Sequence, residues 1–474
     1  MSRTTYDEVR YSNFPYAQTH PDRLATVGAM HGLSTPDPST ARVLEIGCGA
    51  GGNLLAMAVA TPGITAVGVD LAATAIEEGR RAVEAVGIGN VELRQGDISD
   101  LREGQLGDFD FVIAHGVYAW IPEPVRDHLL EAIHSHLAAD GLAYVSYNAQ
   151  PGGYMRRALR DMGYWYAGDA QGPVEIAHRA QELYRFVWDS RAGTKDWWGG
   201  LLESQLDSLA HGPTHRLVHD ELGEFWAPAW FSDVVARAQA AGLAYVGEAD
   251  LGAMLPDRVP PGVTGDLDAF ARGDRLVREQ LIDILRCVFF RMSVLCRDSR
   301  TPEEGPITDA LRELHYAPRR GEPGEEQPSG LLGSVMALLR SRGPDTVPFA
   351  ELRAATGSDP DDLCDALGQG FLTELVMPHR MPLRAVVVAD VERPTASPLV
   401  RFQARTQEEI TSLAYTTVRV EEPAARVLLG LLDGTRDRDA IRADFREQTG
   451  VAISPEDLEV NLDALAKLFL LSES

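Results

Sequence analysis

The residues with the clearest chemical potential form one glycine-rich segment early in the chain. An apolar stretch at residues 42–47 is typical of a buried strand and leads directly into the sequence GCGAGG at residues 47–52. An apolar segment with helical character follows at residues 53–60. Glycine allows a sharp turn and a close approach of the backbone to a ligand, while the first turn of a helix offers unpaired N–H groups. We therefore expect a nucleotide-like ligand at this turn.

Two ligands compete for such a turn. Gly47, Gly49 and Gly52 match the G-x-G-x-x-G spacing of dinucleotide-binding oxidoreductases. Glu45, however, lies two residues before Gly47, where its charge would repel a pyrophosphate but can suit the cationic amino-acid end of S-adenosylmethionine. We therefore expect Glu45, Gly47, Gly49 and Gly51 to bind S-adenosylmethionine, with S-adenosylhomocysteine as its product, in preference to NAD.

Two later strand-like stretches end in aspartates that suit the same ligand. Asp70 closes one of them, with Leu71 beside it, and its carboxylate can accept hydrogen bonds from both ribose hydroxyls. Asp97 and Ile98 follow the next stretch, so Asp97 could accept from the adenine amino group while Ile98 packs on the ring. An aspartate after a strand is also a common turn residue or helix cap, and that alternative stays open for Asp97.

A fourth strand-like stretch, residues 109–114, leads into His115, Gly116 and Tyr118. Ligands of open α/β sheets bind outside the carboxyl ends of the strands, so these residues should face cofactor or substrate. For His115 two interpretations stay open: a catalytic base, or a hydrogen-bonded histidine that shapes the pocket.

The alternation of strand-like and helical stretches predicts an α/β fold with a mostly parallel sheet. Residues 41–153 form its cofactor-binding part. Residues 154–225 break the alternation and predict a helical insertion, after which residues 226–300 resume it and complete a seven-stranded sheet. The predicted strands are residues 42–47, 64–70, 91–95, 109–114, 142–147, 244–248 and 290–297.

The remaining residues predict accessory parts. Residues 1–40 precede the first strand, and residues 301–330 are rich in proline, glycine and charge, which indicates a linker. Residues 331–392 contain three short helical stretches and then an apolar run at 384–389, which suggests a winged-helix-like module. Residues 393–474 predict a last helical module, for which a structural role or dimerisation is the simpler interpretation, and a homodimer is one candidate assembly.

Composition limits the classes of partner. The chain of 474 residues has 70 acidic and 44 basic side chains, a formal charge of −26, which disfavours binding to nucleic acid phosphates. The four cysteines lack any metal-binding spacing, so no metal site is expected. Neither a secretory signal nor a membrane span is apparent, and we expect a cytoplasmic protein.

Taken in order, the glycine turn with Glu45, then Asp70, Asp97 and the stretch ending at His115, resemble the class I S-adenosylmethionine-dependent methyltransferases. The resemblance covers residues 42–148. It implies a Rossmann-like seven-stranded methyltransferase core and transfer of a methyl group.

A narrower resemblance concerns the sequence YDEVRYSNFPYAQTHP at residues 6–21, SYN at 146–148, PGG at 151–153 and HDEL at 219–222. These segments are similar to rickettsial protein lysine methyltransferases that modify outer-membrane proteins, and the last lies in the region that this family carries as a methyltransferase regulatory domain. The resemblance implies that residues 1–40 supply a lid over the cofactor, with Tyr6, Gln18, Thr19 and His20 near it. Arg10 and Tyr16-Ala17 depart from the family pattern.

The acceptor is predicted less directly. The resemblance and the accessory modules favour a protein or peptide side chain, with lysine N-methylation first. A lysine amine must lose a proton before attack, since its reference pKa is about 10.4, and Tyr118, Tyr147 and His20 are the candidates to receive it. A small-molecule or natural-product acceptor, and a cofactor-binding regulator or scaffold without turnover, stay as alternatives.

Overall fold

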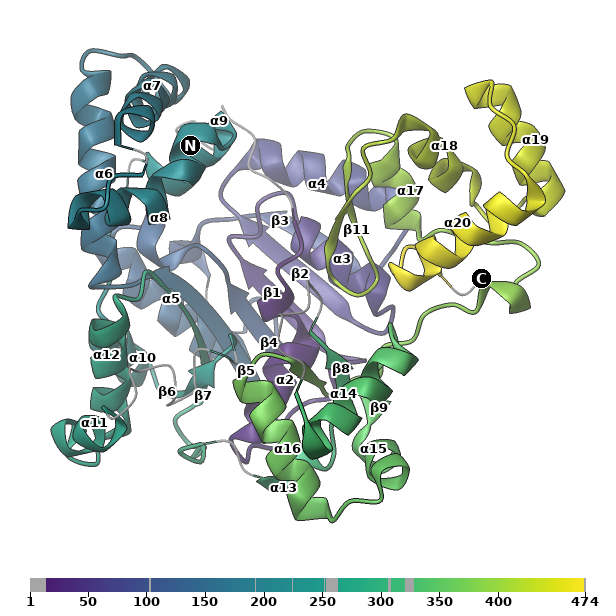
Figure 1. Cartoon of the computed structure of the whole chain (residues 1–474). Helices are drawn as coiled ribbons and strands as arrows, with labels where there is room; N and C mark the ends of the chain where they lie inside the picture. Colours follow the sequence, from purple (N-terminus) through teal and green to yellow (C-terminus); the bar gives the residue numbers. More distant parts are fainter. Residues whose placement is uncertain are drawn as a thin grey trace.

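Short apolar strands with two buried faces build the centre of the molecule. The computed structural model describes residues 14–101, 104–191, 193–223, 225–250, 252, 263–305, 308–319 and 328–472. Within these residues one seven-stranded sheet has the order β3-β2-β1-β4-β5-β7-β6 (Figure 1). Its strands are β1 (Arg42–Ile46), β2 (Thr65–Asp70), β3 (Val91–Gln95), β4 (Phe109–Ala114), β5 (Leu137–Asn148), β6 (Leu243–Glu248) and β7 (Phe290–Arg297). The first five strands are parallel, and β7 is antiparallel to both β5 and β6.

Helices cover both faces of this sheet. Successive strand residues face opposite sides, so Val43 packs in one hydrophobic core and Leu44 in the other. The first core lies under α2 (Pro21–Met30), α3 (Gly52–Ala60) and α4 (Ala73–Val86). The second lies under α5 (Glu123–His136) and α10 (Phe231–Ala240). The molecule therefore has the three-layer α/β architecture that the sequence predicts.

The sheet directs two loops toward each other at the carboxyl ends of β1 and β4. Gly47, at φ 77°, is the first residue after β1, and a Cβ added there would come within 2.4 Å of the side chain of Val117 in the loop after β4. Only glycine permits both the left-handed backbone and this close approach.

The segment between β5 and β7 contains the helical insertion. Its helices are α6 (Gly152–Ala167), α7 (Pro173–Arg191), α8 (Trp197–His211) and α9 (Thr214–Arg216), followed by a π-helical turn, Leu217–Glu221. They enclose a hydrophobic core of their own and stand at one side of the sheet in Figure 1. The chain returns through α10 to β6, and α11 (Thr264–Ala271) and α12 (Arg275–Arg286) precede β7.

A buried ion-pair cluster joins β7 to its surroundings. Arg291 is 4% exposed and lies 3.0 Å from carboxylate oxygens of Glu248 and Glu279 and 2.9 Å from one of Asp283. The three carboxylates neutralise a guanidinium that could not be buried alone.

The middle module differs from the prediction at both of its ends. The helix α13 (Thr308–Leu311) and the strand β8 (His315–Pro318) lie within the predicted linker 301–330. β8 pairs with β9 (Val347–Pro348) and with β10 (Val376–His379), while residues 384–389 contain no strand, which corrects the prediction there. Residues 376–379 form the strand because they pair with β8, which lies about sixty residues earlier in the chain. The apolar run at residues 384–389 gives no sign of that pairing.

Three helices complete the middle module and attach it to the sheet. They are α14 (Gly330–Arg342), α15 (Phe349–Thr356) and α16 (Pro360–Leu372), and their apolar side chains continue the first core. Asp22 of α2 accepts hydrogen bonds from the backbone N–H of Met381, at 2.6 Å, and from Nδ1 of His379, at 2.9 Å.

The C-terminal module has its own hydrophobic core but touches the sheet layer. It comprises α17 (Pro398–Ala404), a hairpin of β11 (Glu409–Thr411) and β12 (Thr417–Arg419), and then α18 (Pro423–Leu431), α19 (Arg438–Thr449) and α20 (Pro455–Lys467). The sequence predicted a helical module here and did not predict the hairpin. Leu399 of α17 and Tyr415 of the hairpin belong to the first core and not to the core of their own module. The helix α17 lies beside α3 and α4 (Figure 1).

None of the helices in the described part of the chain combines the length and the hydrophobicity needed to cross a membrane.

Candidate cofactor and acceptor site

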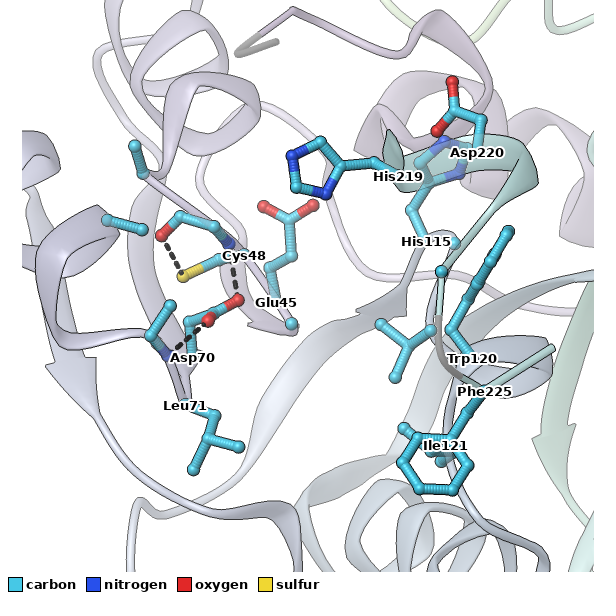
Figure 2. Close-up of a pocket in the computed structure, with 18 of the residues that line it drawn as sticks. Glu45, Cys48, Asp70, Leu71, His115, Trp120, Ile121, His219, Asp220 and Phe225 are labelled. Carbon is cyan, nitrogen blue, oxygen red and sulfur yellow. Dashed lines mark hydrogen bonds between the residues drawn. The ribbon is translucent and has the colours of Figure 1, made fainter. Parts of the chain in front are cut away.

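A cavity of about 1120 Å³ opens at the carboxyl ends of β1, β2, β3 and β4. Figure 2 shows Cys48, Asp70 and Leu71 along one wall, and Trp120, Ile121 and Phe225 along the opposite wall. Eight residues predicted to bind the cofactor line it: Glu45, Gly47, Gly49, Asp70, Leu71, Asp97, Ile98 and His115.

Asp70 holds the glycine turn in shape. Its Oδ2 accepts a hydrogen bond from the N–H of Gly49 at 2.8 Å, and its Oδ1 accepts one from the N–H of Ala72 at 2.8 Å. Each carboxylate oxygen can accept a second hydrogen bond, so ribose hydroxyls remain suitable partners. Gly51, at φ 72°, precedes α3 but does not line the cavity, because it packs against Leu93.

Glu45 is the strongest evidence for a cationic ligand. Its side chain is 3% exposed, and its Oε1 accepts a hydrogen bond from Nδ2 of Asn53 at 2.9 Å. Its Oε2 is buried without a hydrogen-bond partner among the described residues. Burial raises the pKa of Glu45 to about 8, and the nearby charge of Asp70 adds to the rise. The ammonium group of S-adenosylmethionine would satisfy Oε2 and restore the carboxylate form.

Asn53 was not predicted as a site residue, yet it organises this corner of the cavity. Its Oδ1 accepts a hydrogen bond from the N–H of Tyr16 at 3.0 Å, and its Nδ2 donates to Oγ1 of Thr19 at 3.0 Å. It is a buried amide at the start of the otherwise apolar helix α3. A lone polar residue in an apolar helix next to the glycine turn is the signal that could have identified it.

His115 is built into the wall as a neutral ring. Its Nδ1 lies 3.0 Å from the Tyr144 hydroxyl and 3.1 Å from Oγ of Ser146, and its ring lies 3.9 Å from that of Tyr16. Burial lowers the pKa of His115 to about 4. Of the two interpretations, this environment supports a histidine that shapes the pocket, because so weak a base seldom holds a proton at neutral pH.

The end of the cavity near β3 suits an adenine ring. Asp97 caps a short 3-10 turn, since its Oδ1 accepts from the N–H of Ser99 at 2.8 Å, and both Asp97 and Ile98 line the cavity. The cap interpretation is therefore correct for one carboxylate oxygen, and Oδ2 remains available to the adenine amino group.

The wall opposite the glycine turn comes from the π-helical turn after the insertion. His219, Asp220 and Glu221 all line the cavity, and Glu221 is paired with Arg156 of α6. Figure 2 shows His219 and Asp220 across the cavity from Asp70. π-Helical turns occur often at functional sites, and this one overlaps the HDEL segment that resembles the regulatory region of rickettsial methyltransferases.

The three residues predicted to receive a proton do not line this cavity. Tyr118 lines a separate pocket of about 480 Å³ beside Arg126, and Tyr147 is buried in the second core, 3.3 Å from Oγ of Ser293. His20 caps α2, where its Nδ1 accepts from the N–H of Asp22 at 3.2 Å. The structure therefore places none of the three side chains on the cavity wall, and their role as proton acceptors stays a prediction.

The predicted lid reaches the cavity through other side chains. Phe14 and Tyr16 line it, whereas Gln18 does not, and the buried Thr19 acts through Asn53. Tyr6 lies outside the described residues. Within the described ranges, no group of three or more histidine, cysteine or acidic side chains is placed to hold a metal ion.

Comparison with family models divides the chain into three matched parts. Residues 43–141 match a methyltransferase domain, residues 213–297 a predicted methyltransferase regulatory domain, and residues 392–452 the C-terminal winged helix domain of PKMT proteins. The winged-helix match falls on the C-terminal module, whereas the sequence suggested that fold for the middle module. The regulatory-domain match includes the π-helical turn that lines the cavity.

Two uncharacterized proteins of Rickettsia prowazekii are similar in sequence. RP789 is 34% identical over 310 residues, which is 65% of this chain and 56% of RP789. RP028 is 33% identical over 238 residues, which is 50% of this chain and 95% of RP028. The alignment thus spans little more than half the length of RP789 and almost all of RP028.

Among solved structures, PKMT2 from Rickettsia typhi is similar over nearly the whole chain. Its TM-score is 0.84 at 25% identity, with 97% of this chain and 100% of that chain covered. The same protein in complex with AdoHcy gives a TM-score of 0.83 over 97% of this chain and 99% of that chain. The likeness therefore includes the insertion and the C-terminal modules as well as the sheet.

Proposed function

We propose that the acceptor of this enzyme is a protein, and that lysine is the first candidate among its side chains. The chain belongs to the S-adenosylmethionine-dependent methyltransferases that carry a methyltransferase regulatory domain. The observation that carries the proposal is the likeness to PKMT2, a rickettsial protein lysine methyltransferase, over 97% of the chain. That likeness extends to modules that a small acceptor would not require.

The charge of the cavity supports a cationic acceptor. Asp220 lines the wall across from Asp70, and the chain as a whole carries a formal charge of −26. An acidic surface attracts a basic segment of another protein and raises its rate of encounter. The exposed Phe225 and the partly buried Trp120 line the same wall, and both can pack along the aliphatic stem of a lysine.

The size of the cavity also supports two reactants. Pockets for one small ligand commonly measure about 300–1,000 Å³, and this cavity of about 1120 Å³ lies above that range. The cofactor would occupy the side formed by Glu45, Asp70 and Asp97, which leaves the side formed by the π-helical turn for the acceptor.

Methyl transfer depends more on how the amine and the methyl group are positioned than on acid–base catalysis. When bound, the cofactor supplies a methyl group on a sulfonium, which a neutral amine attacks in line. The chain's part is to hold the amine near the carboxyl ends of β1 and β4 and to exclude water. His115 and Tyr16 narrow that space, with their tilted rings 3.9 Å apart. Asp220, whose Oδ2 lies 3.7 Å from Nε of Arg216, is the carboxylate that receives the incoming ammonium group, and the ammonium group loses a proton to solvent before attack.

The proposal is tested with S-adenosylmethionine carrying a labelled methyl group. The purified protein is incubated with the protein fraction and, separately, with the small-molecule fraction of an extract of the source cells. We expect label in the protein fraction, recovered as methyllysine after acid hydrolysis. Label confined to the small-molecule fraction, or alkali-labile label typical of methyl esters, would contradict the proposal.

A charge-neutral variant tests the acceptor wall. Asp220→Asn should raise the KM for the protein acceptor about five- to tenfold, the equivalent of about 1–1.4 kcal/mol, as for one ordinary hydrogen bond, without changing the affinity for S-adenosylmethionine. Asp161→Asn, on the exposed side of α6, is the matched control and should leave both unchanged. Equal KM values for the two variants would remove Asp220 from the acceptor site.

A further inference from the structure

A tyrosine of the C-terminal module reaches the cofactor site. Tyr415 lies in the turn of the β11–β12 hairpin and is 6% exposed. Its hydroxyl oxygen is 2.5 Å from Oδ1 and 2.7 Å from the backbone O of Asn53, and its ring meets that of His20 edge-on at 4.8 Å. A side chain from a separate module therefore donates a hydrogen bond to the first turn of α3.

The hairpin holds Tyr415 in an uncommon backbone conformation. Its φ is 60°, a region that costs a residue other than glycine about 1 kcal/mol. Its N–H donates to the O of Ser412 at 3.0 Å, and the N–H of Ser412 donates to the O of Thr416 at 2.9 Å. The turn is thus fixed by its own hydrogen bonds, and the tyrosine is presented rigidly toward α3.

The N–H of Tyr16 and the hydroxyl of Tyr415 together fix which way the Asn53 amide points. Oδ1 of Asn53 accepts from the Tyr415 hydroxyl and from the N–H of Tyr16, so Nδ2 must face the other way. There it donates to Oε1 of Glu45 at 2.9 Å and to Oγ1 of Thr19 at 3.0 Å. With Oε1 occupied, Oε2 is the Glu45 oxygen left for the ligand.

We propose that Tyr415 is a positioning residue for S-adenosylmethionine, acting through Asn53 on Glu45, and that docking of the C-terminal module therefore sets the affinity of the cofactor site. The role of the module goes beyond holding an acceptor. The inference concerns cofactor binding alone, so it stands or falls independently of which acceptor is methylated.

The role of Tyr415 can be detected in the pH dependence of cofactor affinity, because few of the groups around Glu45 change protonation state near neutral pH. The hydrogen bond from Asn53 lowers the pKa of Glu45, against the rise caused by burial. Burial keeps the pKa values of Cys48, Tyr144 and Tyr415 well above neutral and lowers those of His20 and His115 to about 4, so these groups keep one protonation state near neutral pH. Tyr16, Asp70 and His219 are further titratable groups on the cavity wall.

The experiment is calorimetric titration of the full-length protein with S-adenosylmethionine and with S-adenosylhomocysteine between pH 6 and pH 8. Tyr415→Phe keeps the ring and the backbone and removes only the hydroxyl. We expect a loss of affinity of about two- to tenfold at pH 7, the equivalent of one buried hydrogen bond, and a rising limb of affinity displaced toward higher pH.

Two comparisons distinguish an effect of Tyr415 on the cofactor site from a general loss of protein stability. Tyr316→Phe removes a buried hydroxyl that donates to the O of Leu311 in the middle module, and it should leave cofactor affinity unchanged. In a Glu45→Gln background the effect of Tyr415→Phe should largely disappear, because the two residues act in series.

Unchanged affinity and pH profile in Tyr415→Phe would overturn the proposal. So would a loss of affinity that persists in full in the Glu45→Gln background, or one that Tyr316→Phe reproduces. Thermal unfolding of each ligand-free variant, run in parallel, shows whether the fold itself is retained.

Discussion

Affinity for S-adenosylmethionine should rise steeply with pH through the neutral range, because Glu45 must be ionised to pair with the ammonium of the ligand. Burial raises the pKa of Glu45 to about 8 in the ligand-free protein. From that value, about 1% of Glu45 is ionised at pH 6.0 and about 24% at pH 7.5. The ligand's own amino group has a reference pKa of about 7.7–8.0 and begins to lose its proton near pH 7.5, so the net gain in affinity is about 15-fold.

The proton on the Glu45 carboxyl group also couples ligand binding to the stability of the folded protein. Because the folded, ligand-free protein holds the Glu45 proton more tightly than the unfolded chain does, this group's contribution to stability declines as pH rises from about 4.5 through 8. Bound S-adenosylmethionine opposes that decline, so the ligand-induced increase in Tm should grow from pH 6 to pH 7.5.

The assay is calorimetric titration at four pH values with wild type, Glu45→Gln and His219→Asn. Glu45→Gln keeps the size of the side chain but cannot ionise, so its affinity should be lower at pH 7.5 and should not rise with pH. His219 lines the same cavity, so His219→Asn measures its own share of the rise, and most of the rise should remain in that variant. A flat profile in wild type, or a rise that survives in Glu45→Gln, would refute the reasoning.

Four further variants probe the architecture around the site. Gly79→Ala would place a Cβ 2.4 Å from the O of Ala50, so we expect weaker cofactor binding and about 1–3 kcal/mol lower unfolding free energy, measured by calorimetry and by denaturant titration. Tyr118→Phe and Tyr147→Phe should each leave kcat within about twofold of wild type, because neither side chain lines the cavity; a larger loss would restore a catalytic role. Arg291→Met should lower the unfolding free energy by about 3–5 kcal/mol, because buried carboxylates lose their partner, and an unchanged denaturation midpoint would contradict this.

The sheet could be predicted from the sequence because its signals are local. Each strand is a short apolar run next to glycine or a polar turn, and the seven expected strands all exist. β5 is the exception in length: it begins at Leu137, directly after α5, whereas the prediction began at residue 142. Residues 138–141, AADG, are typical of a turn, and pairing of Leu137 with Phe109 makes them part of the strand.

Whether a predicted side chain reaches the cavity depends on its direction and on contacts that are distant in the sequence. Along β5, Tyr144 and Ser146 face His115, so Tyr147 must face the opposite side of the sheet. Strand alternation alone could have excluded Tyr147 from the cavity. Tyr118 follows β4 in an irregular loop, where no such rule applies.

Asn53 and Tyr415 illustrate the limit of local signals. Asn53 could have been suspected from its place beside the glycine turn. Nothing near Tyr415 in the sequence indicates a partner in α3, because the hydrogen bond depends on how a whole module packs against the sheet.

The hydrogen bond between Tyr415 and Asn53 has a consequence for biosynthesis, since it joins residues 362 positions apart in the chain. A ribosome completes β1 to β5 long before it translates the β11–β12 hairpin. Domains generally fold as units in the order of their synthesis, so the nascent sheet forms with Asn53 still lacking that donor. Full affinity for the cofactor arises only after Tyr415 has left the ribosome, and cofactor binding by a growing chain therefore reports how far its translation has advanced.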